Sequence, residues 1–297
     1  MLAIKTLTHK ITIFRRTARL MGNRFEISVV GNNPLWAEER IDAAIAEINR
    51  VEKLLSVFSE DSTLNEINRN AGIKPVKADP EIFRLIDRSL QIAELTHGAF
   101  DITYAVDDAS AGFINFNNVE INQNAQTVFL KEKGMRIGFG ANGKGYAADR
   151  AKYILQMQGV SSGVISAGGD LLTWGLQPGN EPWTIATADP EQKKQPYAHI
   201  NISNMAIATS VNADNHTPIN KKHFSAVTPV NGFQVSGIKS VSIISPNAEM
   251  ADAMASPVMA IGINAGLYLI NQLNQMACII IDDQGRTYTS KDVKLNN

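Results

Sequence analysis

Short strand patterns and well-bounded helix patterns follow one another in an irregular order, and this order constrains the fold more than any other feature of the chain. Phe25 to Val30 alternates apolar and polar residues after a turn predicted at Leu20-Met-Gly22, as in a strand with one buried face. Further strands are predicted at residues 127–130, 135–137, 163–166 and 239–245, and a hairpin at 277–289 that turns at Asp283-Gln-Gly285.

The predicted helices lie between these strands and begin with capping residues. Asn33-Pro34 supplies an N-cap and a proline at the first helical position, and apolar residues then recur at helical spacing up to Val51. A second helix begins at Asp79-Pro80 and ends near His97, where Gly98 supplies a C-terminal cap. Additional helices are predicted at residues 146–157, 248–262 and 265–273.

This irregular mixture favours an α+β or mixed α/β fold over a regular doubly wound sheet. We expect one large domain of mixed sheets and helices, in one or two lobes, over residues 19–297, preceded by an N-terminal extension at residues 1–18. The basic segment Met1 to Arg16 has no continuous apolar stretch, so we do not expect a signal peptide in it.

Composition and charge exclude several classes of protein. The 28 basic and 29 acidic residues are interspersed and give a formal net charge of −1, so there is no basic footprint for nucleic acid or an anionic membrane. No apolar run is long enough for a transmembrane segment. Cys278 is the single cysteine, which excludes an intramolecular disulfide and a thiolate metal cluster, and we expect it to be a buried core thiol.

A glycine-rich segment, Gly138 to Gly145, lies between a predicted strand and a predicted helix. Backbone amides that open a helix form an anion site, so phosphate is the natural ligand. The segment matches the dinucleotide fingerprint GxGxxG and the first part of the P-loop GxxxxGK. However, Gly145 stands where a P-loop needs Ser or Thr, and the acidic residue of a dinucleotide fold comes late, at Asp170. We therefore expect neither motif, and a simple tight turn is the remaining local alternative.

Asp252 and Ser256 are four residues apart in the helix predicted from Ala248, so their side chains share one face. A carboxylate and a hydroxyl that converge in this way offer the oxygen ligands that magnesium prefers. In isolation, an ordinary solvated Asp252 is the plainer alternative. The pair predicts a magnesium site if both oxygens face the glycine-rich segment.

Seven short motifs occur in the order found in one protein family and span nearly the whole chain. They are Leu20-Met-Gly22, Asp61-Ser62 with Asn68, Phe100-Asp-Ile-Thr103, Gly140 to Asp149, Gly168-Gly-Asp170, Ala208-Thr-Ser210 and Ala251-Asp-Ala253. With these motifs the chain resembles the flavin transferases, FAD:protein FMN transferases first described as thiamine biosynthesis lipoproteins. The resemblance implies a cleft for FAD, Mg²⁺ at its pyrophosphate, and transfer of FMN to a Ser or Thr hydroxyl of a client flavoprotein with release of AMP.

The resemblance also implies roles for individual residues. The positions that match FAD contacts are Met21, Phe58, Asp101, Ile102, Thr103, Gly140 and Lys144. Asp252 and Ser256 match the metal ligands, together with the backbone carbonyl of Gly143. The residues alone leave open that Met21 is core filler and that Asp101 caps a loop locally. Family members generally work at the cell envelope, often with a lipid anchor, although Met1 to Arg16 holds no cysteine to lipidate.

The chain departs from the family pattern at positions close to the expected chemistry. The family's His-Ile-x-Asp-Pro segment corresponds to Ser225-Ala-Val-Thr-Pro229, which lacks both the His and the Asp. His223 and His216 lie nearby and could substitute, with His223 as the candidate catalytic base, although a lone histidine is more often a surface or hydrogen-bonded residue. Val211 replaces the glycine of a Thr-Ser-Gly turn, so the local backbone must differ. Ser256 replaces a threonine, and Pro257 after it should kink the helix.

Two smaller departures concern the expected flavin site. Phe58 stands where the family commonly has tyrosine, which keeps a stacking surface without the hydroxyl. The segment between Thr103 and Thr127 is shorter than usual in the family. All these departures leave three functions open: an active transferase, a degenerate relative that only binds FAD, and a hydrolase in which water replaces the protein acceptor and FAD yields FMN and AMP.

Overall fold

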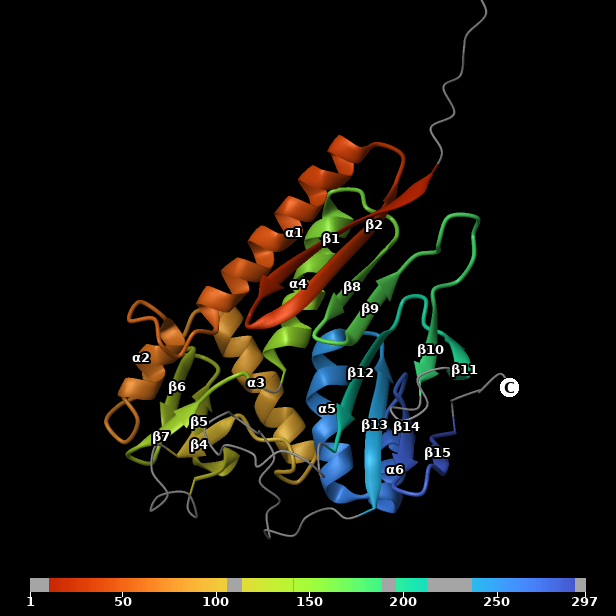
Figure 1. Ribbon diagram of the computed structural model, residues 1–297. Coiled ribbons are helices and arrows are strands. Elements are labelled where there is room, and N and C mark those ends of the chain that lie inside the picture. Colours follow the sequence, from red (N-terminus) through yellow and green to blue (C-terminus); the bar gives the residue numbers. More distant parts are fainter. Residues whose placement is uncertain (1–10, 106–113, 141, 189–195, 213–236, 292–297) are drawn as a thin grey trace, which may run out of the picture.

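An eight-stranded antiparallel sheet organises the molecule (Figure 1). The computed structural model describes residues 11–105, 114–140, 142–188, 196–212 and 237–291. In spatial order the strands are β1 (Thr12–Leu20), β2 (Asn23–Gly31), β8 (Gly163–Ala167), β9 (Asp170–Trp174), β12 (Ala206–Val211), β13 (Ile238–Ser245), β14 (Ala277–Asp282) and β15 (Thr287–Thr289). Every neighbouring pair in this sheet is antiparallel, which excludes a doubly wound parallel sheet.

The first two strands form a hairpin around the predicted turn. Met21 and Gly22 both have positive φ angles, 49° and 71°, as a two-residue hairpin turn requires. The sequence did not predict β1, which carries residues 12–18 of the expected N-terminal extension into the sheet. Most side chains of β1 are exposed or half-buried, because it is an edge strand, and no apolar alternation therefore marks it in the sequence.

A row of helices covers one face of the sheet: α1 (Pro34–Leu54), α4 (Gly143–Met157), α5 (Ala248–Ile261) and α6 (Ile263–Gln272). The Asn33 side chain accepts a hydrogen bond from the amide of Trp36 at 3.2 Å, so the predicted cap of α1 is confirmed. α4 begins three residues before the predicted start at 146, and α5 continues as a helix past Pro257. No helix in the described part of the chain has the length and apolarity that a bilayer crossing needs.

The opposite face of the sheet carries a smaller apolar cluster. The hairpin of β10 (Thr184–Ala188) and β11 (Pro196–Asn201) closes it. Ile200 of β11 packs there with Ile207, Ile244 and Ile279 of the main sheet. The neighbouring residues Ala208 and Ile243 belong to the main core instead, because successive strand residues point to opposite faces.

A second lobe is attached where α1 ends and lies beside α5 in Figure 1. It contains α2 (Thr63–Arg69), α3 (Pro80–Leu95), the 3-10 turn η1 (Phe116–Asn118), the strands β3 (Val76–Lys77), β6 (Thr127–Leu130) and β5 (Val119–Asn122), and the strand pair β4 (Thr103–Ala105) and β7 (Met135–Ile137). Its buried apolar residues join those of the main sheet in one hydrophobic cluster. The structure is thus a mixed α/β domain, as the sequence predicted, and of the two arrangements left open it has the one with two lobes.

Asn68 fixes the end of β7, the strand that leads into the glycine-rich segment. Its amide nitrogen donates to the Ile137 carbonyl at 3.0 Å, and its amide oxygen accepts from the Ile137 amide at 2.8 Å. The Asn68 side chain is buried, so this two-point contact replaces a strand partner where β7 ends. The position of Gly138, the next residue, follows from it.

Candidate functional site

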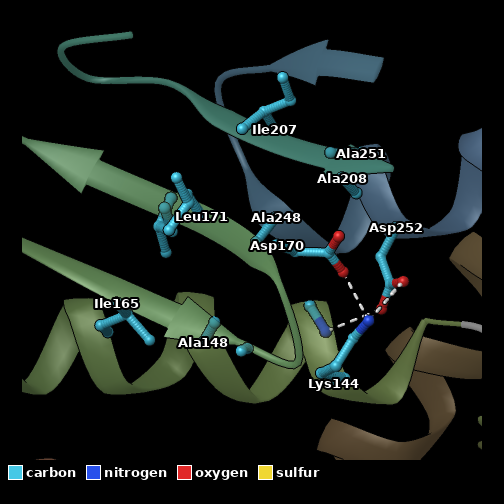
Figure 2. Close-up of a pocket in the computed structure, with 13 residues that line it drawn as sticks. Lys144, Ala148, Ile165, Asp170, Leu171, Ile207, Ala208, Ala248, Ala251 and Asp252 are labelled. Atoms are coloured by element: carbon cyan, nitrogen blue, oxygen red, sulfur yellow. Dashed lines mark hydrogen bonds and ion pairs between the residues drawn. The ribbon is translucent and has the colours of Figure 1, made fainter. Parts of the chain in front are cut away.

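Lys144 lies between two carboxylates that come from different elements (Figure 2). Its Nζ is 2.5 Å from Oδ2 of Asp170, at the start of β9, and 3.3 Å from Oδ1 of Asp252, on α5. Between 13% and 22% of each of these side chains is exposed, so the cluster is screened from water on most sides. The positively charged ammonium group of Lys144 therefore lies between two carboxylates at the first turn of α4.

The electrostatics of this cluster are set by burial and by its mixed charges. Burial has the largest effect on the pKa of Asp252 and raises it, Lys144 lowers it and Asp170 raises it, and the balance places this pKa at about 6. Burial alone would lower the pKa of Lys144, but the facing carboxylates of Asp252 and Asp170 outweigh it and raise that pKa. Lys144 is therefore charged at neutral pH, and Asp252 is ionised above about pH 6.

The first turn of α4 lacks a cap of its own and receives one from α5. Asn142 occupies the N-cap position without a side-chain cap bond, and Oδ2 of Asp252 accepts the amide of Gly145 at 3.0 Å instead. Gly145 has to be glycine, because a methyl group there would lie 2.3 Å from the Ala248 carbonyl oxygen. The two helices thus meet backbone to backbone, with Asp252 directed at the amide end of α4.

Ser256, one turn after Asp252, joins the site through β12. Its Oγ lies 2.8 Å from Oγ of Ser210, and the adjacent Thr209 donates its amide to Oδ1 of Asp170 at 3.0 Å. β12 therefore connects the ion pair at Lys144 with the hydroxyl at Ser256. Val211 continues β12 as a strand residue rather than forming the family's turn, as its β-branched side chain requires.

A small cavity lies behind the ion pair, lined in part by Ile165, Ala208 and Ala251 (Figure 2). Its volume is about 10 Å³, enough for about one water molecule. A dinucleotide cannot enter it.

The other predicted contact residues surround the glycine-rich segment at different distances. The Met21 methyl carbon would lie 3.8 Å from a methyl group built on Gly143, and the Gly138 amide donates to the Ile102 carbonyl at 2.9 Å. Thr103 pairs with Ile137 across β4 and β7. The turn at Met21 therefore adjoins the C-terminal end of the glycine-rich segment, and the residues at strand β4 adjoin its start.

Phe58 and Gly140 are open to solvent. The side chain of Phe58 is 84% exposed, and its neighbour Val57 lies 3.8 Å from the place a Gly138 methyl group would occupy. An exposed aromatic ring beside a glycine-rich loop has a free face for stacking. Gly140 is exposed within the loop. Their contact with FAD stays a prediction.

Asp101 has the local role that the sequence left open. Its two oxygens accept the amides of Thr103 at 2.8 Å and Phe116 at 2.9 Å, so both already have backbone partners. Burial raises the pKa of this carboxyl. His223 and the segment 225–229 lie outside the described residues.

Asp252 and Ser256 carry oxygen donors of the kind that a divalent cation shared with a phosphate ligand would use. Within residues 11–291, excluding the gaps given above, no three His, Cys, Asp or Glu side chains are grouped as a metal cage. Asp252 and Ser256 provide a carboxylate and a hydroxyl on one helix face, and Gly143 lies at the first position of the adjoining α4. Magnesium is usually held by one or two carboxylates together with substrate phosphates, so this sparse oxygen set suits it.

Two residues of the cluster were not among the predicted site residues. In the sequence, Asp170 belongs to the motif Gly168-Gly-Asp170 and is the late acidic residue of the rejected dinucleotide pattern, and Ser210 belongs to the motif Ala208-Thr-Ser210. Their membership of the motifs was the available signal, because contacts between β9, β12 and the helices cannot be derived from sequence spacing.

The fold and this cluster define a class of protein: a mixed α/β domain with a carboxylate–lysine site where two helix N-termini meet, suited to phosphate and a divalent cation. The sequence profile of the ApbE family matches residues 21–280. The chain belongs to that family, which confirms the resemblance seen in the motifs.

Relatives and solved structures agree with this assignment. The chain is 26% identical over 270 residues to the FAD:protein FMN transferase of Klebsiella pneumoniae (strain 342), covering 82% of this chain and 77% of the relative. Its fold matches the apbe protein of Thermotoga maritima with a TM-score of 0.79 at 23% identity, over 94% of this chain and 97% of the other. The apo flavinyl transferase ApbE of Pseudomonas stutzeri matches with a TM-score of 0.79 at 21% identity, over 96% of each chain.

Proposed function

We propose that the chain is a transferase that moves FMN from FAD to a Ser or Thr hydroxyl of a client flavoprotein and releases AMP. The observation that carries the proposal is the Lys144 cluster at the first turn of α4, in a member of a family whose relatives are named FAD:protein FMN transferases. The reaction forms a bond between the hydroxyl oxygen and the phosphorus of FMN. The bond from that phosphorus to the oxygen of the AMP phosphate breaks, and the hydroxyl proton is released.

In this proposal the first turn of α4 and the Lys144 ammonium bind the FAD diphosphate. Helix amides and a charged lysine are suited to phosphate oxygens. Gly143, Asp252 and Ser256 would hold Mg²⁺, which supplies neutralisation of the charge on the phosphate oxygens. Lys144 then exchanges part of its contact with Asp252 for a contact with phosphate.

The flavin and the acceptor would be placed by residues around the glycine-rich segment. We assign Met21, Phe58, Ile102, Thr103 and Gly140 to the FAD surface, with Phe58 offering an exposed ring for stacking. We keep Asp101 as a residue that shapes this surface through its two backbone contacts.

His223 is a candidate base for the acceptor hydroxyl, since it lies near the family's missing histidine in the sequence, but we propose that transfer does not depend on it. We expect His223→Ala to leave transfer nearly intact, because phosphoryl transfer depends mainly on positioning and charge neutralisation. A thousandfold loss of transfer in that variant would instead assign it an essential role.

One assay tests the proposal against the two alternatives that the departures left open. Purified protein is incubated with FAD, with and without Mg²⁺ and a peptide bearing the acceptor Thr, and the products are identified by mass spectrometry. Covalent FMN on the peptide together with AMP is the expected result. Free FMN and AMP would identify a hydrolase, and unchanged FAD a binding protein; either outcome would overturn the proposed transfer.

Asp252→Ala supplies the matched variant for this assay. We expect it to abolish transfer, because it removes a carboxylate ligand without removing core volume. Asp283→Ala is the control, since Asp283 is an exposed residue of the β14–β15 turn, and it should retain wild-type turnover. Undiminished turnover in Asp252→Ala would remove Asp252 from the site.

A further inference from the structure

Two helix N-termini at the site cap each other through a reciprocal pair of carboxylates. Asp149, on α4, accepts the amides of Ala248 at 3.0 Å and Glu249 at 2.8 Å, the first two amides of α5. In return, Asp252 on α5 accepts the amide of Gly145 on α4 at 3.0 Å. Each helix therefore supplies the acceptor for the other helix's unsatisfied amides.

The backbones at this crossing lie so close that the carboxylates fix their relative position. A methyl group at Gly145 would be 2.3 Å from the carbonyl oxygen and 2.7 Å from the carbonyl carbon of Ala248. No side chain fits between the backbones of the two helices at this point. A small shift of either helix would therefore stretch the hydrogen bonds made by Asp149 and Asp252.

Asp149 has no role in the chemistry proposed above, although it is costly to bury. Burial has the largest effect on its pKa and raises it, its amide contacts and Lys152 lower it, Glu249 raises it, and the balance places the pKa at about 6. A carboxylate held in this unfavourable setting contributes through geometry, because its two hydrogen bonds both go to one helix end.

Side chains of α3 also bind the N-terminal ends of α4 and α5. Asp149 is therefore not the sole contact that holds these two helix ends together. Tyr146 of α4 donates its hydroxyl to Glu81 at 2.5 Å. Arg88 donates to both carboxylate oxygens of Glu249 on α5, at 3.1 Å and 2.9 Å. Removal of Asp149 should therefore loosen the crossing without separating the helices.

We propose that Asp149 is a positioning residue that sets the spacing between the amide end of α4 and the metal ligands on α5. The metal part of this inference rests on the proposed function, whereas the coupling of the two helix ends does not. Since outer contacts of a metal site typically change affinity by about 10–100-fold, we expect Asp149→Ala to weaken Mg²⁺ binding within that range.

Asn247→Ala is the matched control. Asn247 also caps α5, accepting the Met250 amide at 3.2 Å, but it makes this bond within α5 and does not tie it to α4. Both substitutions remove capping from the same helix end. Only the loss of Asp149 should affect α4, and Asp149→Asn, which retains one acceptor oxygen, should lie between wild type and Asp149→Ala.

The test combines hydrogen exchange of the full chain with Mg²⁺ titration. In exchange measured by mass spectrometry, Asp149→Ala should speed exchange in both 143–149 and 248–256, and Asn247→Ala in 248–256 alone. Faster exchange confined to 248–256 in Asp149→Ala would overturn the coupling. Asp149→Asn applies the same criterion if Asp149→Ala does not fold.

Mg²⁺ binding, followed through the fluorescence of bound FAD, then tests the metal part. Affinity reduced about 10–100-fold in Asp149→Ala and unchanged in Asn247→Ala supports the proposal. Equal affinities in all three proteins would overturn it. If the wild type binds no Mg²⁺, the proposed function and the metal part fail together, while the exchange result still decides the coupling.

Discussion

The substitution Gly145→Ala tests the crossing of α4 and α5 most sharply, because helix propensity and packing predict opposite changes in the free energy of unfolding. Gly145 is inside a helix and does not have a positive φ, so alanine should by propensity stabilise the protein by about 1 kcal/mol. The structure predicts the reverse. The added methyl group would lie 2.3 Å from Ala248 O, where ordinary contacts begin at 3.4 Å.

The magnitude follows from the displacement that the methyl group requires. The obstacle is backbone, so the helices must separate by about 1 Å, and overpacking of this kind costs about 1–3 kcal/mol. Weakened caps at the two helix ends add about 1–2 kcal/mol. After the propensity gain, we expect the free energy of unfolding to fall by about 1–4 kcal/mol and Tm by roughly 2–8 °C.

Thermal and urea unfolding, followed by circular dichroism, measure this change. Gly143→Ala is the control on the same helix: the atoms nearest to its methyl group would be side-chain atoms, Leu55 Cδ1 at 3.1 Å and Phe139 Cβ at 3.3 Å, rather than a backbone carbonyl. Its unfolding free energy should stay within about 1 kcal/mol of wild type. A Tm for Gly145→Ala at or above the wild-type value would refute the reasoning.

Three further predictions concern separate parts of the account. Asn68→Ala should lower the unfolding free energy by about 2–4 kcal/mol in urea titrations, because the buried amide and carbonyl of Ile137 lose their partner. An unchanged unfolding midpoint would contradict a stabilising role for the Asn68 contact. Burial, together with Glu249, raises the folded-state pKa of Asp149 to about 6. Protonation of Asp149 therefore stabilises the folded protein by about 3 kcal/mol below about pH 4, and this stabilisation is lost as the pH rises through 6. The stability of the wild type relative to Asp149→Asn should therefore fall between pH 4 and 7, and a pH-independent difference would argue against the shift. Ser210→Ala should weaken Mg²⁺ binding about 10–100-fold. Thr209→Ala should leave it unchanged, because the Thr209 hydroxyl bonds to Ser242 on another strand. Equal affinities in the two variants would exclude Ser210 as a support for the proposed ligand Ser256.

Local signals in the sequence were sufficient where one short segment fixes the structure. Asn33 and Asp79 cap α1 and α3 as predicted, because a cap depends only on neighbouring amides. The turn at Met21-Gly22 and the end of α3 before Gly98, which has φ of 81°, follow from the same kind of local chemistry. The irregular order of these helices and strands along the chain is also the basis on which the mixed α/β fold class is predicted.

Long-range contacts decided what the sequence could not show. The sequence predicts a helix only from residue 146, yet Gly143 to Gly145 form the first turn of α4, because Asp252 caps it from another helix. Asp252 itself was predicted, since its spacing to Ser256 is a local property. The pairing of Lys144 with Asp170 depends on how β9 lies against α4, and no spacing rule encodes that arrangement.

The central claim is that α4 and α5 together hold a divalent cation beside the FAD diphosphate. Anomalous diffraction from crystals grown with FAD and Mn²⁺ tests it most directly. We predict an anomalous peak about 2.1–2.2 Å from a carboxylate oxygen of Asp252, from Oγ of Ser256 and from the carbonyl oxygen of Gly143, with Lys144 turned toward phosphate. A peak bound elsewhere, or an Asp252–Lys144 pair that persists with FAD bound and no peak beside it, would contradict the account.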